Sequence, residues 1–152
     1  GSGNLQPQPG NQNMKRFILS AILILLTMTA YSQQHSDNEA LLAPVKQQLE
    51  AYNNRDIEKF ASAFSEDVKV YRQPGVLTYQ GRDELKKRYG AMFAATPDLH
   101  CEIVNRIVAG EVVIDQEKVQ RTKGQPRTDA IAVYRVKDGQ IVEVTFIPPT
   151  SN

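Results

Sequence analysis

The chain has little of the chemistry that identifies most enzymes. Among its 152 residues there is one cysteine, there are two histidines, and there is no tryptophan. Cys101 stands alone, so no internal disulfide can form and the fold must depend on packing. With no H-x-x-x-H pattern or clustered His and Cys, the sequence predicts no metal site. Glycine-rich phosphate loops and a serine-nucleophile elbow are also absent, and we expect no cofactor.

The chain also has no large excess of positive or negative charge. The formal net charge is +1, and acidic and basic residues alternate along the chain. Nucleic-acid-binding surfaces and anionic membrane surfaces attract clustered basic residues, which this composition does not provide. We therefore expect neither as a partner.

Long apolar runs are confined to one segment near the N-terminus. Residues 14–32, MKRFILSAILILLTMTAYS, combine a charged start, an apolar stretch and small residues at their end. This pattern predicts a secretory signal peptide cleaved after Ser32, and hence a periplasmic or secreted protein that leaves the membrane after cleavage. The alternatives are an uncleaved anchor or a buried helix. Residues 1–13, rich in Gln, Pro, Asn and Gly, are expected to be a disordered tag or a misassigned start. Residues 33–152 then form a single domain.

Helical periodicity dominates the first half of that domain. Apolar residues at three- and four-residue spacing predict a helix through Leu41–Tyr52, which Ser36 or Asp37 could cap and whose first turn could hold Pro44. Asp56 is expected to cap a second helix. Residues 82–95 predict a third. The apolar stripe of the second helix is predicted to comprise Ile57, Phe60, Ala61 and Phe64.

Extended patterns surround and follow the third helix. Residues 68–71 and 77–79 predict short strands, and four longer strands are predicted afterwards, separated by turn signals. Strands joined by short turns pair with each other, so these four should form an antiparallel meander. Helices that precede such a sheet define an α+β fold. The longer strands are predicted over 99–108, 111–121, 127–136 and 140–147.

One strand carries a pattern of special interest, VIDQEKV at residues 113–119. Asp115 and Glu117 are two residues apart and therefore share one face of a strand, while Gln116 points to the other. The two acids could be a catalytic carboxylate pair inside the sheet or charges on its outside. The sequence pattern alone permits both.

The order of the predicted elements resembles the cone-shaped nuclear transport factor 2-like superfamily, and within it the SnoaL-like, steroid delta-isomerase-like branch. The resemblance rests on AYNNRDIEKFASAFSEDVKVY at 51–71, YQGRDELKKRYGAMF at 79–93 and AIAVYRVKDGQIVEVTFI at 130–147. It implies three helices packed on a strongly curved, mainly antiparallel sheet that encloses a pocket. It also implies a homodimer formed through the outer face of that sheet.

Ketosteroid isomerases of this superfamily use a tyrosine, a basic aspartate and a protonated aspartate. The resemblance places these positions on Gln48, near Arg72 and on Ala132. None of the three residue types is retained, and an arginine cannot serve as a base at ordinary pH. Steroid isomerisation by that mechanism is therefore not expected.

The same resemblance implies which side chains point into the pocket. It places Asp115 and Glu117 on the outside and the glutamine between them on the inside. Arg88 has a second interpretation, as a solvent-exposed partner of Glu84 on the third helix. The expected ligand-pocket residues are Gln116, Tyr134, Arg72, Lys118, Tyr89, Arg88, Phe93, Phe146, Ile114 and Val144.

Three functions are compatible with these features. The first is an exported domain that binds a small apolar or amphipathic molecule without catalysis. The second is an isomerase, cyclase or hydrolase with a different polar set, such as Arg72, Gln116 and Tyr134, in the same pocket. The third is a non-catalytic association domain that dimerises through its sheet.

Overall fold

The structure is a computed structural model that describes residue 3 and residues 10–149. The chain divides into two units, residues 1–37 and 38–152, which are considered separately. Helix α1 (Gly10–Asn54) begins in the first unit. The disorder expected for residues 1–13 is therefore wrong for residues 10–13, which are helical. Apart from Gly3, the other residues of that prediction lie outside the described residues. By length and composition alone, this apolar part of α1 could cross a membrane, as signal sequences also can.

The helix predicted around Leu41–Tyr52 is present, but its start is not where the sequence suggested. The helix continues through Ser36, Asp37 and Pro44 without a break, so neither proposed cap begins it. Within the second unit, α1 buries Val45, Gln48 and Ala51 against the rest of the domain.

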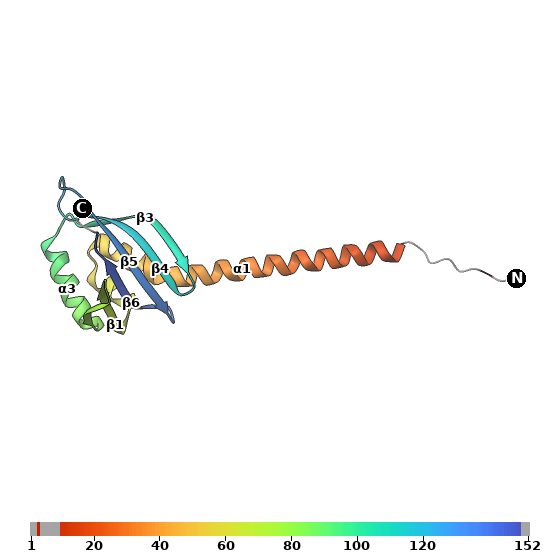
Figure 1. Cartoon of the computed structure of the whole chain (residues 1–152), viewed down its shortest axis with the longest axis horizontal. Helices are drawn as coiled ribbons and strands as arrows, with labels where there is room; N and C mark the ends of the chain where they lie inside the picture. The colour runs from red at the N-terminus through yellow and green to blue at the C-terminus, as the bar shows by residue number, and fades with distance from the viewer. Residues whose placement is uncertain (1–2, 4–9, 150–152) are drawn as a thin grey trace. The chain divides into compact units, whose positions relative to one another are not determined.

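The remaining elements follow the predicted order of an α+β fold (Figure 1). Helix α3 and strand β6 have the predicted bounds, whereas β1 begins at Phe64, which the sequence had assigned to the preceding helix. The elements are α2 (Ile57–Ser62), β1 (Phe64–Arg72), β2 (Val76–Gln80), α3 (Arg82–Ala95), β3 (His100–Ala109), β4 (Val112–Gln120), β5 (Thr128–Lys137) and β6 (Gln140–Ile147).

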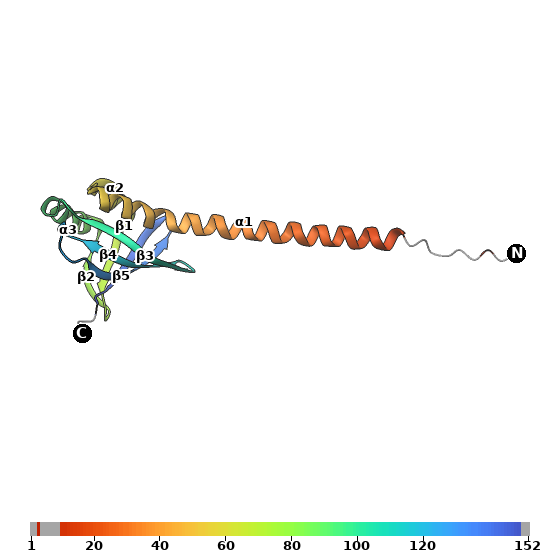
Figure 2. The same ribbon diagram turned by 90° about the horizontal axis from the view of Figure 1, so that it is seen from above.

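The six strands form one mixed sheet in the order β2-β1-β6-β5-β4-β3. Strands β3 to β6 pair antiparallel with their sequence neighbours, which confirms the meander. Strand β1 runs parallel to β6 and antiparallel to β2. The sheet curves and stays open, and the helices lie on its inner side (Figure 2).

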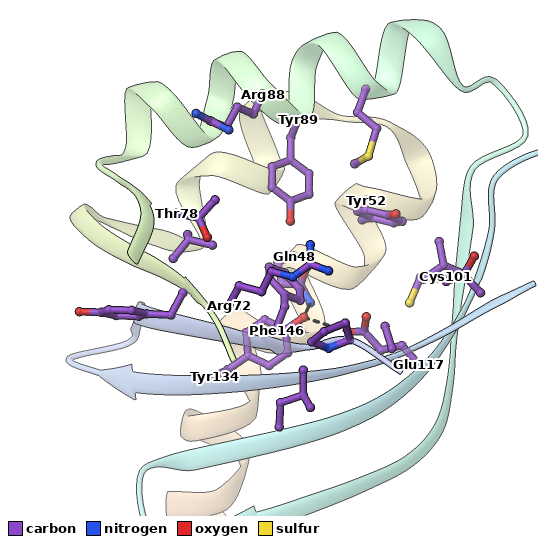
Figure 3. A pocket seen from close by; sticks show the side chains of 18 of the residues that line it. Gln48, Tyr52, Arg72, Thr78, Arg88, Tyr89, Cys101, Glu117, Tyr134 and Phe146 are labelled. Carbon is purple, nitrogen blue, oxygen red and sulfur yellow. Dashed lines mark hydrogen bonds between the residues drawn. The ribbon is translucent and has the colours of Figure 1, made fainter. Parts of the chain in front are cut away.

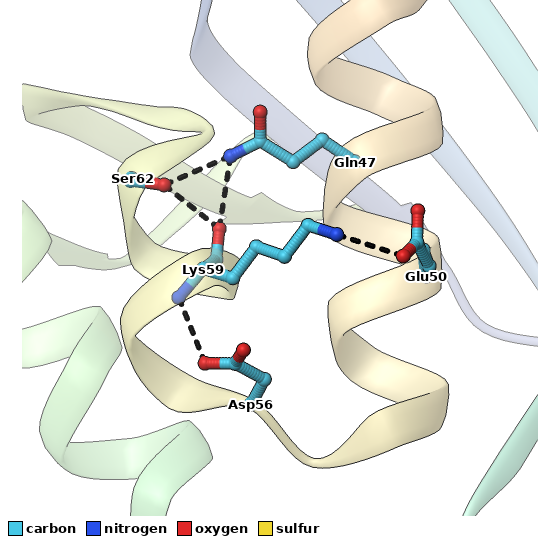
Figure 4. Close-up of polar contacts among 5 residues, drawn as sticks. All are labelled: Gln47, Glu50, Asp56, Lys59 and Ser62. Carbon is cyan, nitrogen blue, oxygen red and sulfur yellow. Dashed lines mark hydrogen bonds and ion pairs between the residues drawn. The ribbon is translucent and has the colours of Figure 1, made fainter.

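Polar contacts fix α2 against the last turns of α1 (Figure 4). Asp56 caps α2 as predicted, because its Oδ1 accepts a hydrogen bond of 3.0 Å from the backbone N–H of Lys59. From α1, Gln47 Nε2 donates to the Lys59 carbonyl and the Ser62 hydroxyl, while Glu50 pairs with Lys59 Nζ at 2.7 Å. These contacts satisfy polar groups at both ends of the short helix.

An aromatic cluster packs the three helices together. Phe60 of α2 lies 4.5 Å from the ring of Tyr89 on α3 and 5.5 Å from Phe93, and Tyr52 of α1 lies 5.6 Å from Phe93, each measured between ring centroids. Such tilted and edge-to-face pairs are favourable for aromatic rings. The cluster joins the three helices, and two of its rings, Tyr52 and Tyr89, also line the pocket.

Candidate functional site

A pocket of about 590 Å³ lies between the inner face of the sheet and helices α1 and α3 (Figure 3). Its volume is within the range of small-molecule sites. Much of the lining is apolar or aromatic, including Leu49, Val70, Met92, Val119 and Phe146. The polar and charged lining comes from Gln48, Arg72, Thr78, Arg88, Glu117, Arg121, Thr128 and Asp129, together with the tyrosines Tyr52, Tyr71, Tyr79, Tyr89 and Tyr134.

Strand β4 presents the opposite face to the pocket from the one that the family register implied. Asp115 and Glu117 are buried, with 0% and 7% of their surfaces exposed, whereas Gln116 is exposed. The prediction that the two acids point outward is therefore wrong. The inward orientation predicted for Gln116, Lys118 and Ile114 is wrong as well, since they alternate with the buried residues along the strand.

An ion pair on the inner face explains why an acid can be buried there. Arg106 Nε and Nη2 donate to the two oxygens of Asp115 over 2.6 and 2.7 Å. A carboxylate with no exposure would be costly without such a partner. Arg106 reaches this position after the register of β3 against β4 shifts between Ile103 and Asn105. Such a shift changes which side chains face inward on the two sides of it.

Glu117 is held by a second set of contacts. Tyr134 Oη donates to Glu117 Oε1 over 3.1 Å, and Gln48 Nε2 donates to the same Tyr134 oxygen over 3.1 Å. Glu117 Oε2 receives no hydrogen bond from any described residue. Glu117 Oε2 is also not one of the fully buried polar atoms that lack a hydrogen-bond partner among the described residues. Because it is therefore accessible, we infer that it faces the pocket. One oxygen is thus fixed and the other is left available.

Burial changes the acidity of this carboxyl group. The pKa of Glu117 is raised from its ordinary value of 4.5 to about 7, chiefly because burial disfavours the charged carboxylate. The hydrogen bond from Tyr134 opposes the rise, the charge of Asp115 adds to it, and Arg106 opposes it. A carboxyl group with this pKa can both accept and return a proton near neutral pH.

The tyrosines around the pocket remain neutral donors. Burial raises the pKa of Tyr134 and of Tyr89 well above 10, and the pKa of Tyr79 to about 12. Their hydroxyl groups therefore stay protonated at ordinary pH and can donate or accept hydrogen bonds. Cys101 also lines the pocket, but burial raises the pKa of its thiol to about 12, which leaves it a poor nucleophile.

The structure brings part of the predicted pocket set together. Arg72, Arg88, Tyr89, Tyr134 and Phe146 line the pocket, while Val144 lines a smaller adjoining cavity. Phe93 belongs to the aromatic cluster and borders a separate shallow groove instead. The contacts of these residues with a ligand stay predictions. The three positions matched to the ketosteroid isomerase residues are Gln48 and Arg72, which line the pocket, and the fully buried Ala132.

Sequence reasoning missed Glu117 as a pocket residue, and with it Tyr52 and Arg121. Tyr52 was predicted as part of the apolar pattern of the first helix, but its place beside the pocket depends on where α1 crosses the sheet. For Glu117 the local signal was weak, because its strand face carries Val113 and Val119 while the opposite face carries Val112 and Ile114. Among the described residues, no group of three His, Cys, Asp or Glu side chains could hold a metal ion.

The fold and the pocket define an α+β protein of the cone-shaped, nuclear transport factor 2-like class. Residues 45–144 match the family model of the SnoaL-like domain, and the chain belongs to that family. None of the curated proteins compared with the chain matches it.

Solved structures agree with this placement. An uncharacterised cystatin-fold protein from Novosphingobium aromaticivorans is 28% identical, covers 70% of this chain and 97% of its own, and has a TM-score of 0.64. A protein from Kribbella flavida, provisionally named a ketosteroid isomerase, is 21% identical with coverages of 75% and 81% and a TM-score of 0.63. An epoxide hydrolase of M. tuberculosis is 18% identical, with coverages of 71% and 81% and a TM-score of 0.58. At the last two identities, the likeness concerns the fold alone.

Proposed function

We propose that the domain binds a small, mostly apolar molecule in its pocket and moves a proton on that molecule through Glu117. The reaction class is that of an isomerase, cyclase or hydrolase whose first step is the removal of a proton from carbon or from water by a base. The observation that carries the proposal is the Glu117 carboxyl group, buried in the pocket wall with Oε1 bonded to Tyr134.

The two oxygens of the Glu117 carboxyl group can have different roles in the proposed reaction. Tyr134 orients the carboxyl group through Oε1 and is itself oriented by Gln48 on α1. We assign Oε2, the oxygen that receives no hydrogen bond from the described residues, as the atom that accepts the substrate proton. Protonated Glu117 then returns that proton to another atom of the substrate or product, which leaves the enzyme in its starting state. The pKa of about 7 balances the two half-steps.

The polar set differs from the one expected in the second hypothesis. In the proposed set, Glu117 takes the role that was expected of Gln116, because Gln116 points away from the pocket. Tyr134 and Arg72 remain, the first as a hydrogen-bond donor beside the base and the second on the pocket wall. Binding without catalysis, the first hypothesis, is the competing outcome of the same experiment.

The test compares Glu117→Gln with the unmodified protein. The amide keeps the size of the side chain but cannot take up a proton at this pH. A library of ketones, lactones, epoxides and aromatic acids is first screened by thermal shift, and bound compounds are then followed by NMR in deuterated water. We expect the unmodified protein to exchange or rearrange protons of at least one bound compound, and Glu117→Gln to slow this by a factor of about 100 or more.

Glu66→Gln is the matched control, because Glu66 is an exposed glutamate on β1 outside the pocket lining. It should bind and react like the unmodified protein. If compounds bind but the unmodified protein and Glu117→Gln leave them equally unchanged, the domain is a binding protein and the catalytic proposal is wrong. If no compound shifts the melting temperature, the proposed ligand class is wrong.

We also propose that the domain is exported. The apolar start of α1 is long enough for a signal sequence, and a signal cleaved after Ser32 would leave the SnoaL-like domain intact. Intact mass measurement of the protein from cell fractions tests this. A mature chain beginning at Gln33 outside the cytoplasm is expected, and a chain retained in the membrane with residues 14–32 would contradict it.

A further inference from the structure

Three arginines line the exposed side of the pocket. Arg72 is the last residue of β1, Arg88 lies on α3, and Arg121 directly follows β4. All three side chains are exposed. Within the described part of the chain, neither Arg72 nor Arg121 lies within ion-pair distance of a carboxylate. A purely apolar ligand would leave these guanidinium groups without any role in binding.

Two of these arginines are oriented by neighbouring side chains. The Arg88 guanidinium lies 4.6 Å from the centroid of the Tyr79 ring, and its Nε donates to Glu84 over 2.7 Å. Arg121 Nη1 lies 3.6 Å from the Met92 sulfur, which connects the end of β4 to α3. A cation stacked on a ring keeps its edge free for further hydrogen bonds. These contacts therefore provide part of the geometry needed to bind an anion.

Negative charge around the same pocket is smaller. The acidic lining consists of Asp129, which is exposed at the start of β5, and Glu117, which is buried in the wall. The lining of the exposed side thus carries three positive side chains against one negative side chain, and Glu84, outside the lining, pairs with Arg88. A cleft with apolar walls and one dominant sign of charge attracts ions of the opposite sign.

The apolar part of the pocket lining suits a carbon skeleton. The sheet contributes Val70, Val119 and Phe146 to it, and the helices contribute Tyr52 of α1 and Met92 of α3. We propose that the ligand is a small amphipathic organic anion. Its apolar skeleton would lie against these side chains, and its carboxylate or phosphate group would be bound by Arg72, Arg88 and Arg121. This inference rests on the proposed function, since it names the substrate class of the same pocket.

Anchoring the head group would also orient the substrate. Arginines at the exposed side fix one end of the molecule, and the skeleton then extends towards Glu117 in the wall. Binding energy from the head group would thereby hold the reacting atom near Glu117 Oε2, the proposed proton acceptor.

Two fluorescent probes with one skeleton test this recognition. 8-Anilinonaphthalene-1-sulfonate is an amphipathic anion, and N-phenyl-1-naphthylamine is the same skeleton without the sulfonate. We expect the arginine variants Arg72→Gln, Arg88→Gln and Arg121→Gln, combined in one chain, to weaken binding of the anionic probe by a factor of at least about 10. Binding of the neutral probe should change less than about twofold, and added salt should weaken the anionic probe alone.

Arg135→Gln is the control, because Arg135 is an exposed arginine of β5 that pairs with Glu111 and does not line the pocket. It should affect neither probe. The inference is overturned if the anionic probe does not bind, if the triple variant binds it as well as the unmodified protein does, or if both probes weaken equally. Displacement of the anionic probe by 2-naphthoate or by 2-naphthyl phosphate then distinguishes a carboxylate from a phosphate ligand.

The outcome is separable from the test of proton transfer. The probes undergo no reaction, so they report recognition alone, while the NMR comparison of Glu117→Gln reports chemistry. A pocket that prefers the neutral probe but still exchanges substrate protons through Glu117 would contradict the anionic ligand and leave the proposed function in place. The reverse result would support the anionic ligand and remove the catalytic role.

Discussion

Tyr134 donates a hydrogen bond of 3.1 Å to Glu117 although the two residues are not opposite each other in the sheet. The register pairs Tyr134 with Val113 and pairs Glu117 with Ala130. The tyrosine ring therefore extends along the inner face of the sheet, over a position occupied by the small residue Ala132. A larger residue there would occupy the space that the ring needs. Ala132, which the superfamily resemblance matches to an aspartate of ketosteroid isomerases, thus leaves room for the Tyr134 ring to reach Glu117.

Removing this hydroxyl group should change the acidity of Glu117 without removing its carboxyl group. In Tyr134→Phe, the hydrogen bond that stabilises the carboxylate is lost, so the pKa of Glu117 should rise above about 7. Proton transfer should lose roughly tenfold in rate at neutral pH. NMR titration of the glutamate side chains measures the shift. Tyr71→Phe is the control, because Tyr71 also lines the pocket but has no hydrogen bond to Glu117. An unchanged pKa in Tyr134→Phe would contradict the geometry.

The raised pKa of Glu117 also predicts how stability depends on pH. The folded pKa of about 7 exceeds the ordinary value of 4.5, so between these values the folded state binds the proton more tightly. Above pH 7 the folded protein must hold a buried charge, and its free energy of unfolding is reduced. As the pH falls through 7 towards 4.5, this contribution should increase stability by up to about 3 kcal/mol. Urea unfolding of the unmodified protein and of Glu117→Gln at about pH 5 and about pH 8 isolates the contribution of Glu117 to the free energy of unfolding. A pH dependence that is the same in both proteins would contradict this prediction.

The Arg106–Asp115 pair should be important for the fold itself. Asp115 has no exposed surface, and both of its oxygens accept from Arg106. Arg106→Gln would leave the carboxylate without its partner, and we expect a loss of about 3 to 5 kcal/mol in the free energy of unfolding. Glu58→Gln, which breaks the exposed pair with Lys86, should cost less than about 1 kcal/mol. Chemical denaturation of both variants gives the comparison, and equal losses would contradict it.

The sequence predicted the helices and strands of the domain well because each has a strong local signal. Helix α3 is bounded by Gly81 and Pro97, and the turn between β5 and β6 contains Asp138 and Gly139, both with positive φ. Inward residues of β5 such as Tyr134 were also predicted correctly. Local signals of this kind fix where elements begin and end, and the superfamily resemblance supplied their arrangement.

The orientation of β4 could not be predicted in the same way. One face of this strand carries two apolar and two acidic residues, and the other carries two apolar and three polar residues, so hydrophobic alternation does not choose clearly between them. The connection from β4 to β5 is long, so it does not fix the register of β4 against β5. The register shift between β3 and β4 means that the turn before β4 does not fix its pairing with the whole of β3 either. The deciding interaction is the contact of Asp115 with Arg106, which depends on that shift. The predicted and the observed orientation of β4 differ by one residue. This difference places the candidate base Glu117 in the pocket and not on the outside of the sheet.

The outer face of the sheet leads to a final prediction, a homodimer. Register partners place Ile107, Ile114 and Val133 in one apolar row across β3, β4 and β5, and Ile107 is 52% exposed. A row of this kind can pack against a second copy of itself around a two-fold axis. Light scattering coupled to size exclusion should therefore show a dimer, and Ile107→Glu should convert it to a monomer. Val76→Glu changes an equally exposed residue of β2, outside the row, and should leave the dimer intact. A monomeric unmodified protein would rule out the dimer, and a dimer that survives Ile107→Glu would place the contact elsewhere.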